Sequence, residues 1–233
     1  MPENRGVRAE RVLDAAAELI VRWGYDKTTI EDIARAAGVA KGTIYLHWKT
    51  REDLFIALLR RERVALMTDV QQRVAGDPAG ATLRSVIEKI AVAYVRRPLL
   101  KAVLLRDMEV IGKLSRQREL QRTPKLQRGL ARYVADLRDL KLVRTDLDLH
   151  AQLAVLSAVF LGFFGTAAVM PAEYALGEEQ MAALSAETVA RMLDRGTALD
   201  DGERTAVADI TDRFLAGTLA EERAKYEQMS GLE

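Results

Sequence analysis

Cationic and hydroxyl-bearing side chains gather between residues 41 and 51 in a pattern that can bind a polyanion. Lys41, Lys49 and Arg51 carry positive charge, and Thr43 supplies a hydroxyl group. Such side chains bind phosphate oxygens or the edges of bases. Gly42 has no side chain, so the backbone there can approach a ligand closely. A helix is expected to begin after residue 50, and its N-terminus together with Lys49 and Arg51 favours a phosphate. The segment therefore predicts contact with a nucleic acid.

Two short helices, near residues 29–37 and 41–47, are expected to position these side chains. Thr28 and Glu31 form a capping-box pattern ahead of the first helix. Gly38 stands where the chain must turn sharply, because a left-handed backbone costs little only for glycine. The apolar residues suited to the core between the helices are Ile30, Ile33, Ala34, Ala37, Val39 and Ile44. This spacing predicts a helix-turn-helix whose second helix enters the major groove of DNA.

The outward face of the second helix is expected to carry most of the DNA contacts. The residues predicted to bind DNA are Thr28, Thr29, Lys41, Gly42, Thr43, Tyr45, Leu46, His47, Lys49 and Arg51. Tyr45 and His47 offer amphipathic contacts with little loss of rotamer entropy. Two alternatives stay open at this point. Tyr45 and Trp48 also suit a protein core, which for Trp48 is the stronger interpretation, and a single histidine such as His47 is more often structural than a contact.

The rest of the chain also has helical periodicity, which predicts an all-α protein of about nine to ten helices. The expected helices cover residues 8–23, 29–37, 41–47, 51–74, 80–96, a segment beginning at Pro98, a segment from about 124 to 140, a segment from a cap at Asp146 or Asp148 to 170, and segments within 179–195 and 202–226. We therefore expect a three-helix DNA-binding domain at residues 1–50. A larger helical domain follows at residues 51–233, and the fourth helix joins the two directly.

Composition excludes several classes of protein. The 233 residues include no cysteine, which rules out disulfides, thiolate catalysis and cysteine-based metal sites. The most apolar stretch, Leu153–Met170, is interrupted by small and polar residues, so no run of about 18 consecutive apolar residues indicates a membrane span. The first residues lack the pattern of a secretory signal peptide. These features predict a cytoplasmic protein that does not enter a membrane.

The sequence carries no recognisable catalytic or metal-binding motif. Its two histidines, His47 and His150, lie far apart in the sequence. It contains no H-E-x-x-H, no G-x-S-x-G and no glycine-rich phosphate loop after a strand. We therefore expect no catalytic residues, no metal and no cofactor, although a pair of carboxylates working as acid and base leaves no such motif.

The segment from residue 8 to about residue 60 resembles the DNA-binding domain of the tetracycline-repressor (TetR) family. The matching residues are Gly24-Tyr25, Thr28-Thr29-Ile30, Ile33-Ala34, Ala37-Gly38-Val39, Lys41-Gly42-Thr43-Ile44-Tyr45, His47 and Lys49 to Phe55. Two positions depart from the family pattern. Trp48 stands where phenylalanine is usual. Ala40 replaces a common serine, which removes a helix cap and a possible phosphate contact, and Ala40 and Leu46 together are expected to alter operator preference.

The resemblance implies an all-helical homodimer that binds a palindromic operator, most commonly as a repressor. It also implies a C-terminal domain that holds an effector pocket and the dimer interface. For the interface, Ala154–Phe164 is apolar around much of its circumference, and this feature suits equally a buried core helix. The apolar stripe of the last helix, which serves either the interface or the core, consists of Val207, Ile210, Phe214 and Leu215.

A small lipophilic effector is expected to bind among the helices between residues 51 and 170. The candidate lining residues are Met67, Tyr94, Leu104, Met108, Tyr133, Leu137, Phe160 and Phe164, each of which also suits an ordinary core. The resemblance implies that the bound effector moves the fourth helix and releases the DNA. An alternative is a DNA-binding protein that responds to a partner protein and has no small-molecule ligand. A cavity in the larger domain would favour an effector, and a solidly packed domain would favour a partner.

Overall fold

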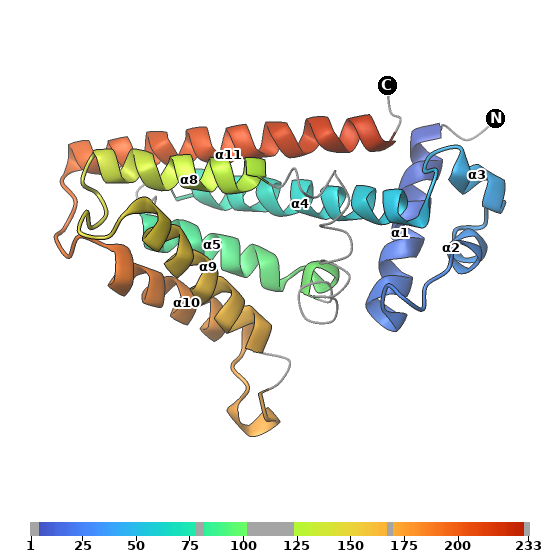
Figure 1. Cartoon of the computed structure of the whole chain (residues 1–233), viewed down its shortest axis with the longest axis horizontal. Coiled ribbons are helices and arrows are strands. Elements are labelled where there is room, and N and C mark those ends of the chain that lie inside the picture. The colour runs from blue at the N-terminus through green and yellow to red at the C-terminus, as the bar shows by residue number, and fades with distance from the viewer. Residues whose placement is uncertain (1–4, 78–81, 102–123, 167–169, 231–233) are drawn as a thin grey trace. The chain divides into compact units, whose positions relative to one another are not determined.

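The structure is a computed structural model that describes residues 5–77, 82–101, 124–166 and 170–230. Within these ranges the regular elements are helices, and the only β pairing is an isolated bridge between Val143 and Asp194 (Figure 1). The prediction of an all-α protein is therefore confirmed. The elements are α1 (Arg5–Trp23), α2 (Ile30–Ala37), α3 (Lys41–Tyr45), α4 (Arg51–Ala75), α5 (Leu83–Val95), α8 (Pro124–Asp139), α9 (Leu149–Thr166), the short 3-10 helix η2 (Ala172–Tyr174), α10 (Glu178–Leu193) and α11 (Asp201–Ser230).

Helix boundaries lie where the sequence offers a cap or a left-handed residue. Gly24 ends α1 with a φ of +86°, and its N–H donates to Ile20 O over 2.9 Å. Thr82 caps α5 by accepting a hydrogen bond from the backbone of the third helical residue. Of the two caps expected for α9, Asp148 takes the role, since its Oδ1 accepts from Ala151 N over 2.8 Å.

The chain forms two compact units. Of the described residues, the first unit contains 5–65, 97–101 and 220–230, and the second contains 66–77, 82–96, 124–166 and 170–219. The first unit therefore includes residues 51–65 of α4, beyond the boundary expected at residue 50. The reason is contact across that boundary, because the Phe55 and Tyr25 rings lie 4.5 Å apart and both side chains are buried.

The C-terminal end of α11 is part of the first unit. Arg61 of α4 bridges two carboxylates of α1, with its Nη1 3.1 Å from Glu10 Oε2 and 2.7 Å from Asp14 Oδ1. The Tyr226 hydroxyl of α11 donates to the same Glu10. Burial and the neighbouring Glu10 carboxylate both raise the pKa of Tyr226, so its hydroxyl keeps its proton. These contacts connect α1, α4 and α11 within one unit.

The second unit has a core of α5, α8, α9, α10 and the first half of α11. Figure 1 shows α5, α9 and α10 packed together, and α10 contacts both of the others. Val207 and Ile210 of α11 are buried in this core, and Phe214 packs on Tyr133 with ring centroids 4.7 Å apart. The apolar stripe of the last helix therefore covers the core, which is one of the two roles expected from the sequence.

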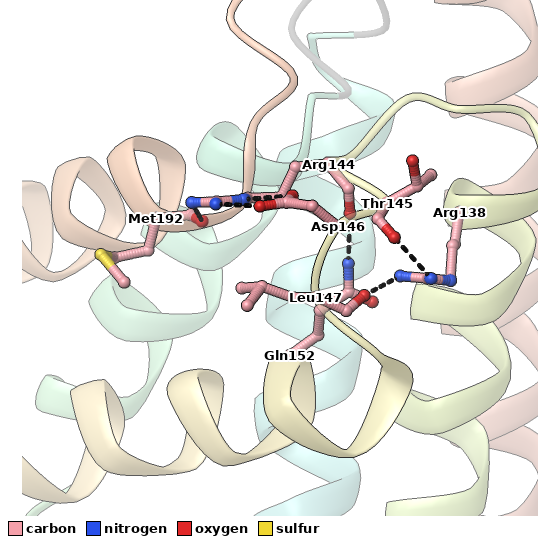
Figure 2. Close-up of polar contacts among 7 residues, drawn as sticks. All are labelled: Arg138, Arg144, Thr145, Asp146, Leu147, Gln152 and Met192. Carbon is pink, nitrogen blue, oxygen red and sulfur yellow. Dashed lines mark hydrogen bonds and ion pairs between the residues drawn. The ribbon is translucent and has the colours of Figure 1, made fainter.

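The connection between α8 and α9 is held by side chains that bind backbone carbonyls (Figure 2). The buried Gln152 donates to Arg144 O over 2.7 Å, and Arg138 donates to Thr145 O over 2.8 Å. The Arg144 guanidinium pairs with Asp146 and holds the pKa of that carboxyl at about 2. The backbone carbonyls of Arg144 and Thr145 are thus satisfied beside an apolar core.

Helix α9 is unusually apolar for its exposure. By length and composition alone it would be able to cross a membrane, yet 17% of it is buried inside the structure. The sequence prediction considered only uninterrupted runs, and Gly162 and Thr166 interrupt this one. A mostly buried core helix and a signal sequence near the N-terminus meet the same criterion, so one such helix is weak evidence of a membrane span. Leu161 is an exposed member of this face, with 48% of its surface accessible.

Candidate nucleic-acid interface

The cap of α2 lies one residue later than the sequence predicts. The N-cap is Thr29, whose Oγ1 accepts from Asp32 N over 3.2 Å, and Thr29 N donates to Asp32 Oδ2 over 3.4 Å. The capping box is therefore Thr29 with Asp32, and the prediction of Thr28 with Glu31 is wrong. Adjacent threonines followed by adjacent acids allow both registers, and the position of the preceding turn selects between them.

The Thr28 side chain is buried and makes a hydrogen bond inside the first unit. Its side chain is 1% exposed, and its hydroxyl donates to Gly24 O over 2.8 Å. This bond joins the end of α1 to the start of α2. The Thr28 side chain is therefore a structural group, which corrects its prediction as a DNA contact, while the neighbouring Thr29 is exposed.

The Arg51 side chain also makes contacts inside the first unit. Its Nη1 donates to Thr28 O over 3.2 Å, and the guanidinium lies 4.2 Å from the centroid of the Tyr25 ring. Burial raises the pKa of Tyr25 to about 12, and the Arg51 charge acts in the opposite direction. The guanidinium thus fastens the start of α4 to the turn before α2. Arg51 therefore also positions the start of α4, and because its side chain is half-buried and these hydrogen bonds use only Nη1, its contact with phosphate stays a prediction.

Gly38 makes the turn between α2 and α3, as the sequence predicts. Its φ of +64° is left-handed, and its N–H donates to Arg35 O over 3.2 Å. Val39 N donates to Ala34 O over 3.0 Å, which satisfies a second carbonyl at the end of α2. The turn therefore satisfies the helix end and redirects the chain into α3.

The two faces of α3 differ in polarity. Ile44 and Trp48 are buried and anchor the helix to the unit, which confirms Trp48 as a core aromatic. The exposed residues are Lys41, Gly42, Tyr45, Leu46 and Lys49, and Thr43 and His47 are half-buried. Ala40 occupies the N-cap and provides no side-chain hydrogen bond, as its residue type predicts. The residues expected to face DNA, apart from Thr28, are at least partly accessible.

Lys41 has an acidic partner within this surface. Its Nζ contacts Glu31 Oε1 of α2 and lies 5.8 Å from the centroid of the Tyr45 ring. The hydrogen bond between Lys41 and Glu31 raises the pKa of the amine and lowers that of the carboxyl. An exposed ion pair of this kind contributes little to stability. The pair orients the amine and can be exchanged for a phosphate at small cost.

A second capping box begins α4, and the sequence prediction did not include it. Asp53 N donates to Thr50 Oγ1 over 3.0 Å, and Thr50 N donates to Asp53 Oδ2 over 3.1 Å. The T-x-x-D pattern at residues 50–53 was the signal. Because a carboxylate already occupies this helix N-terminus, it is less favourable for phosphate than expected.

The candidate effector residues occupy different environments in the second unit. Tyr94 lies 4.9 Å from Phe160 and 5.2 Å from Phe164 between ring centroids, so these three form one aromatic cluster. Tyr133 and Leu137 belong to the main core, where the Tyr133 hydroxyl contacts Thr211 Oγ1 at 3.3 Å. Met67 is buried on α4, and Leu104 and Met108 lie outside the described residues.

Described residues of the second unit line two apolar cavities. One has a volume of about 220 Å³, lies among α5, α8, α9 and α10, and includes Phe160 of the candidate residues. Its other walls come from residues absent from the prediction, namely Ile87, Ile90, Ala91, Leu130, Leu156, Ser157, Val159, Ser185 and Val189. The other, of about 610 Å³, is more open and lies against Gly162, Phe163 and Tyr174 among others. Core stripes do not reveal from sequence alone where packing leaves space.

Comparisons with known proteins agree with the geometry of α2 and α3. Residues 12–58 match the family model described as bacterial regulatory proteins, tetR family. The chain is 31% identical to the HTH-type transcriptional regulator AcrR of Shigella flexneri over 119 residues. This alignment covers 48% of this chain and 55% of that protein. The chain thus spans about half the length of this curated relative.

Solved structures extend the similarity of fold to most of the chain. NalD, the secondary repressor of the MexAB-OprM multidrug efflux pump in Pseudomonas aeruginosa, aligns with a TM-score of 0.61 at 22% identity, over 82% of this chain and 97% of that one. The complex of SmeT from Stenotrophomonas maltophilia with triclosan aligns with a TM-score of 0.60 at 19% identity, over 84% of this chain and 96% of that one.

Proposed function

We propose that this chain, which belongs by its residues 12–58 to the tetR family of bacterial regulatory proteins, regulates transcription by binding double-stranded DNA through α3. The observation that carries the proposal is the polarity of α3. Ile44 and Trp48 anchor one face, while Lys41, Gly42 and Tyr45 are exposed on the other. A helix exposed in this way fits the major groove. The matched proteins are regulators, and we assign no enzymatic activity to the chain.

The contacts divide by chemistry into two groups. Lys41 and Lys49 are suited to phosphates, which contribute affinity but no sequence information. Gly42, Thr43 and Tyr45 are suited to close approach and to base edges. The full set that we propose is Thr29, Lys41, Gly42, Thr43, Tyr45, Leu46, His47, Lys49 and Arg51. Since DNA is the ligand, the site of action is the cytoplasm.

A footprint of the full chain on the DNA next to its own gene identifies the protected segment. The affinity of the chain for that segment then tests binding to DNA. Lys41→Ala and Tyr45→Ala are each expected to weaken binding. Lys41→Ala is also expected to reduce the slope of log affinity against log salt concentration by about one, the value for one phosphate contact. Arg132→Ala is the matched control for charge, because Arg132 is an exposed residue of α8 in the second unit. Unchanged affinity of both α3 variants at physiological salt would refute the contact assignment.

We propose further that the chain acts as a homodimer on a palindromic operator. Two recognition helices related by a twofold axis read half-sites about one helical turn apart, or a multiple of that distance. The exposed apolar face of α9, with Leu161 at its surface, supports an interface there, since large exposed apolar patches mark association sites. Leu161→Glu is expected to yield monomers in light scattering, whereas Leu140→Glu, at a comparably exposed leucine after α8, is not. A single unpaired half-site in the footprint would contradict the dimer.

The cavity of about 220 Å³ supports control by a small apolar effector rather than by a partner protein. It is smaller than the roughly 300–1,000 Å³ of drug-sized sites, which favours a compact ligand. Helix α4 offers a route for the signal, because its residues 51–65 belong to the first unit and 66–75 to the second. An effector that binds the non-DNA conformation better shifts the population and releases the operator, so the chain works as a repressor.

Triclosan, which SmeT binds in its complex, serves as a first probe of the cavity. Addition of triclosan is expected to raise the melting temperature of the chain and to lower operator affinity. Ala91→Leu fills part of the cavity and is expected to abolish the rise while leaving operator binding intact. Equal ligand-induced shifts in both proteins would place the binding site elsewhere.

A further inference from the structure

Leu46 has the largest exposed fraction of the exposed large apolar side chains in the described residues, at 72%. It is the C-cap residue of α3, where its backbone remains helical with φ −71° and ψ −22°. Isolated exposed leucines are common on protein surfaces, so exposure alone indicates nothing. The position is what distinguishes Leu46, because it lies on the element that the proposed function brings into the major groove.

The packing of α3 keeps Leu46 on the outside. Ile44 and Trp48, the residues two positions before and after it, are both buried and anchor the opposite face. The other exposed residues from 41 to 46, all of which the structure describes, are Lys41, Gly42 and Tyr45. Of these four, only Leu46 carries a side chain without a polar group. An apolar group at this place has no hydrogen bond to offer a base.

The major groove presents one apolar group, the 5-methyl group of thymine, among the donors and acceptors of the base edges. We propose that Leu46 packs against the methyl group of one thymine in each half-site and so determines the preference for thymine at that position. The inference rests on the proposed function, since it requires α3 to lie in the groove. It adds the chemical group that Leu46 recognises.

The experiment replaces each thymine of the footprinted operator, one symmetric pair at a time, with deoxyuridine. This change removes only the methyl group and leaves every hydrogen-bonding group of the base in place. For the wild-type chain, we expect one thymine position whose replacement weakens binding about four-fold per half-site. That factor corresponds to about 0.8 kcal/mol for one buried methyl group.

Leu46→Ala is expected to bind the unmodified (thymine) operator more weakly than the wild type does. It is expected to bind the operator with deoxyuridine at the sensitive position (the uridine operator) with the same affinity as the thymine operator. Because Leu46 is exposed, the melting temperature of the Leu46→Ala variant is expected to equal that of the wild type. Lys41→Ala is the matched control. It is expected to bind both operators more weakly and to keep the ratio between them, about four-fold per half-site, since a phosphate contact does not sense the methyl group.

The outcomes separate this inference from the proposed function. A wild-type chain that binds the operator with no sensitivity to any uridine would overturn the role of Leu46 and leave DNA binding intact. A thymine sensitivity that persists unchanged in Leu46→Ala would assign the methyl contact to another residue and overturn it as well. Failure of the wild-type chain to bind any DNA would instead refute the proposed function on which the inference rests.

Discussion

A buried carboxylate on the last helix provides the sharpest test of how the first unit is held together. The Glu222 side chain of α11 is 4% exposed, and its Oε2 lies 3.8 Å from Arg60 Nη1 of α4, a side chain that is itself 12% exposed. Its Oε1 lies 3.3 Å from Lys225 Nζ. Glu222→Gln keeps the size of the side chain, removes its charge and leaves two cations beside a neutral group.

The expected loss of stability follows from this geometry. Removing one partner of a buried ion pair costs about 3–5 kcal/mol, because the other charge loses that counterion in a place that water reaches poorly. The lower end applies here, since 3.8 Å is too long for a hydrogen bond and Lys225 is partly exposed. A loss of about 3 kcal/mol corresponds to a fall in melting temperature of about 6–12 °C for a chain of this size.

The assay is thermal unfolding of the full chain followed by circular dichroism at fixed pH and salt. Glu221→Gln is the matched control, because Glu221 is the preceding residue of the same helix, is 50% exposed and lies 3.9 Å from the same Lys225 Nζ. We expect the control to change the free energy of unfolding by less than about 0.5 kcal/mol. Equal shifts for the two variants would refute the argument that burial of the Glu222–Arg60 pair matters.

Three further predictions concern single positions. Ala40→Ser supplies the missing N-cap of α3 and should raise the free energy of unfolding by about 1 kcal/mol; an unchanged urea midpoint would contradict this. Gly38→Ala should lower the free energy of unfolding by about 1 kcal/mol, because φ at this position is +64°. Gly42→Ala should raise it by a similar amount, because Gly42 lies inside α3 and an added Cβ would meet open space. Shifts of the same sign for the two variants would show the reasoning to be wrong. Burial raises the pKa of Tyr133 to about 12, so the unfolded chain ionises first and the wild type loses stability as the pH rises from about 10 to 12. Tyr133→Phe cannot ionise, so the difference in melting temperature should shift in its favour over that window, and a constant difference would exclude the effect.

The helix-turn-helix was predictable from the sequence because its signals are local. Gly38 is needed for a left-handed turn, and the apolar residues before and after it recur at helical spacing. The cap of α2 shows the limit of local signals. Thr28 and Thr29 are both followed three residues later by an acid, and local chemistry cannot choose between the two registers. The choice depends on Gly24, whose carbonyl accepts the Thr28 hydroxyl and leaves Thr29 to cap the helix.

The destinations of long side chains were decided by the tertiary structure alone. Arg51 has the residue type and position of a phosphate ligand, yet it binds two carbonyls 23 and 26 residues earlier in the chain. Tyr226 and Glu10 form a hydrogen bond although they lie 216 residues apart in the chain, and no periodicity in the sequence predicts such a contact. Sequence determines which face of a helix is apolar, because that depends on the helical repeat. It does not determine which neighbour covers that face or where packing leaves a cavity, because these depend on how all the helices fill the same space.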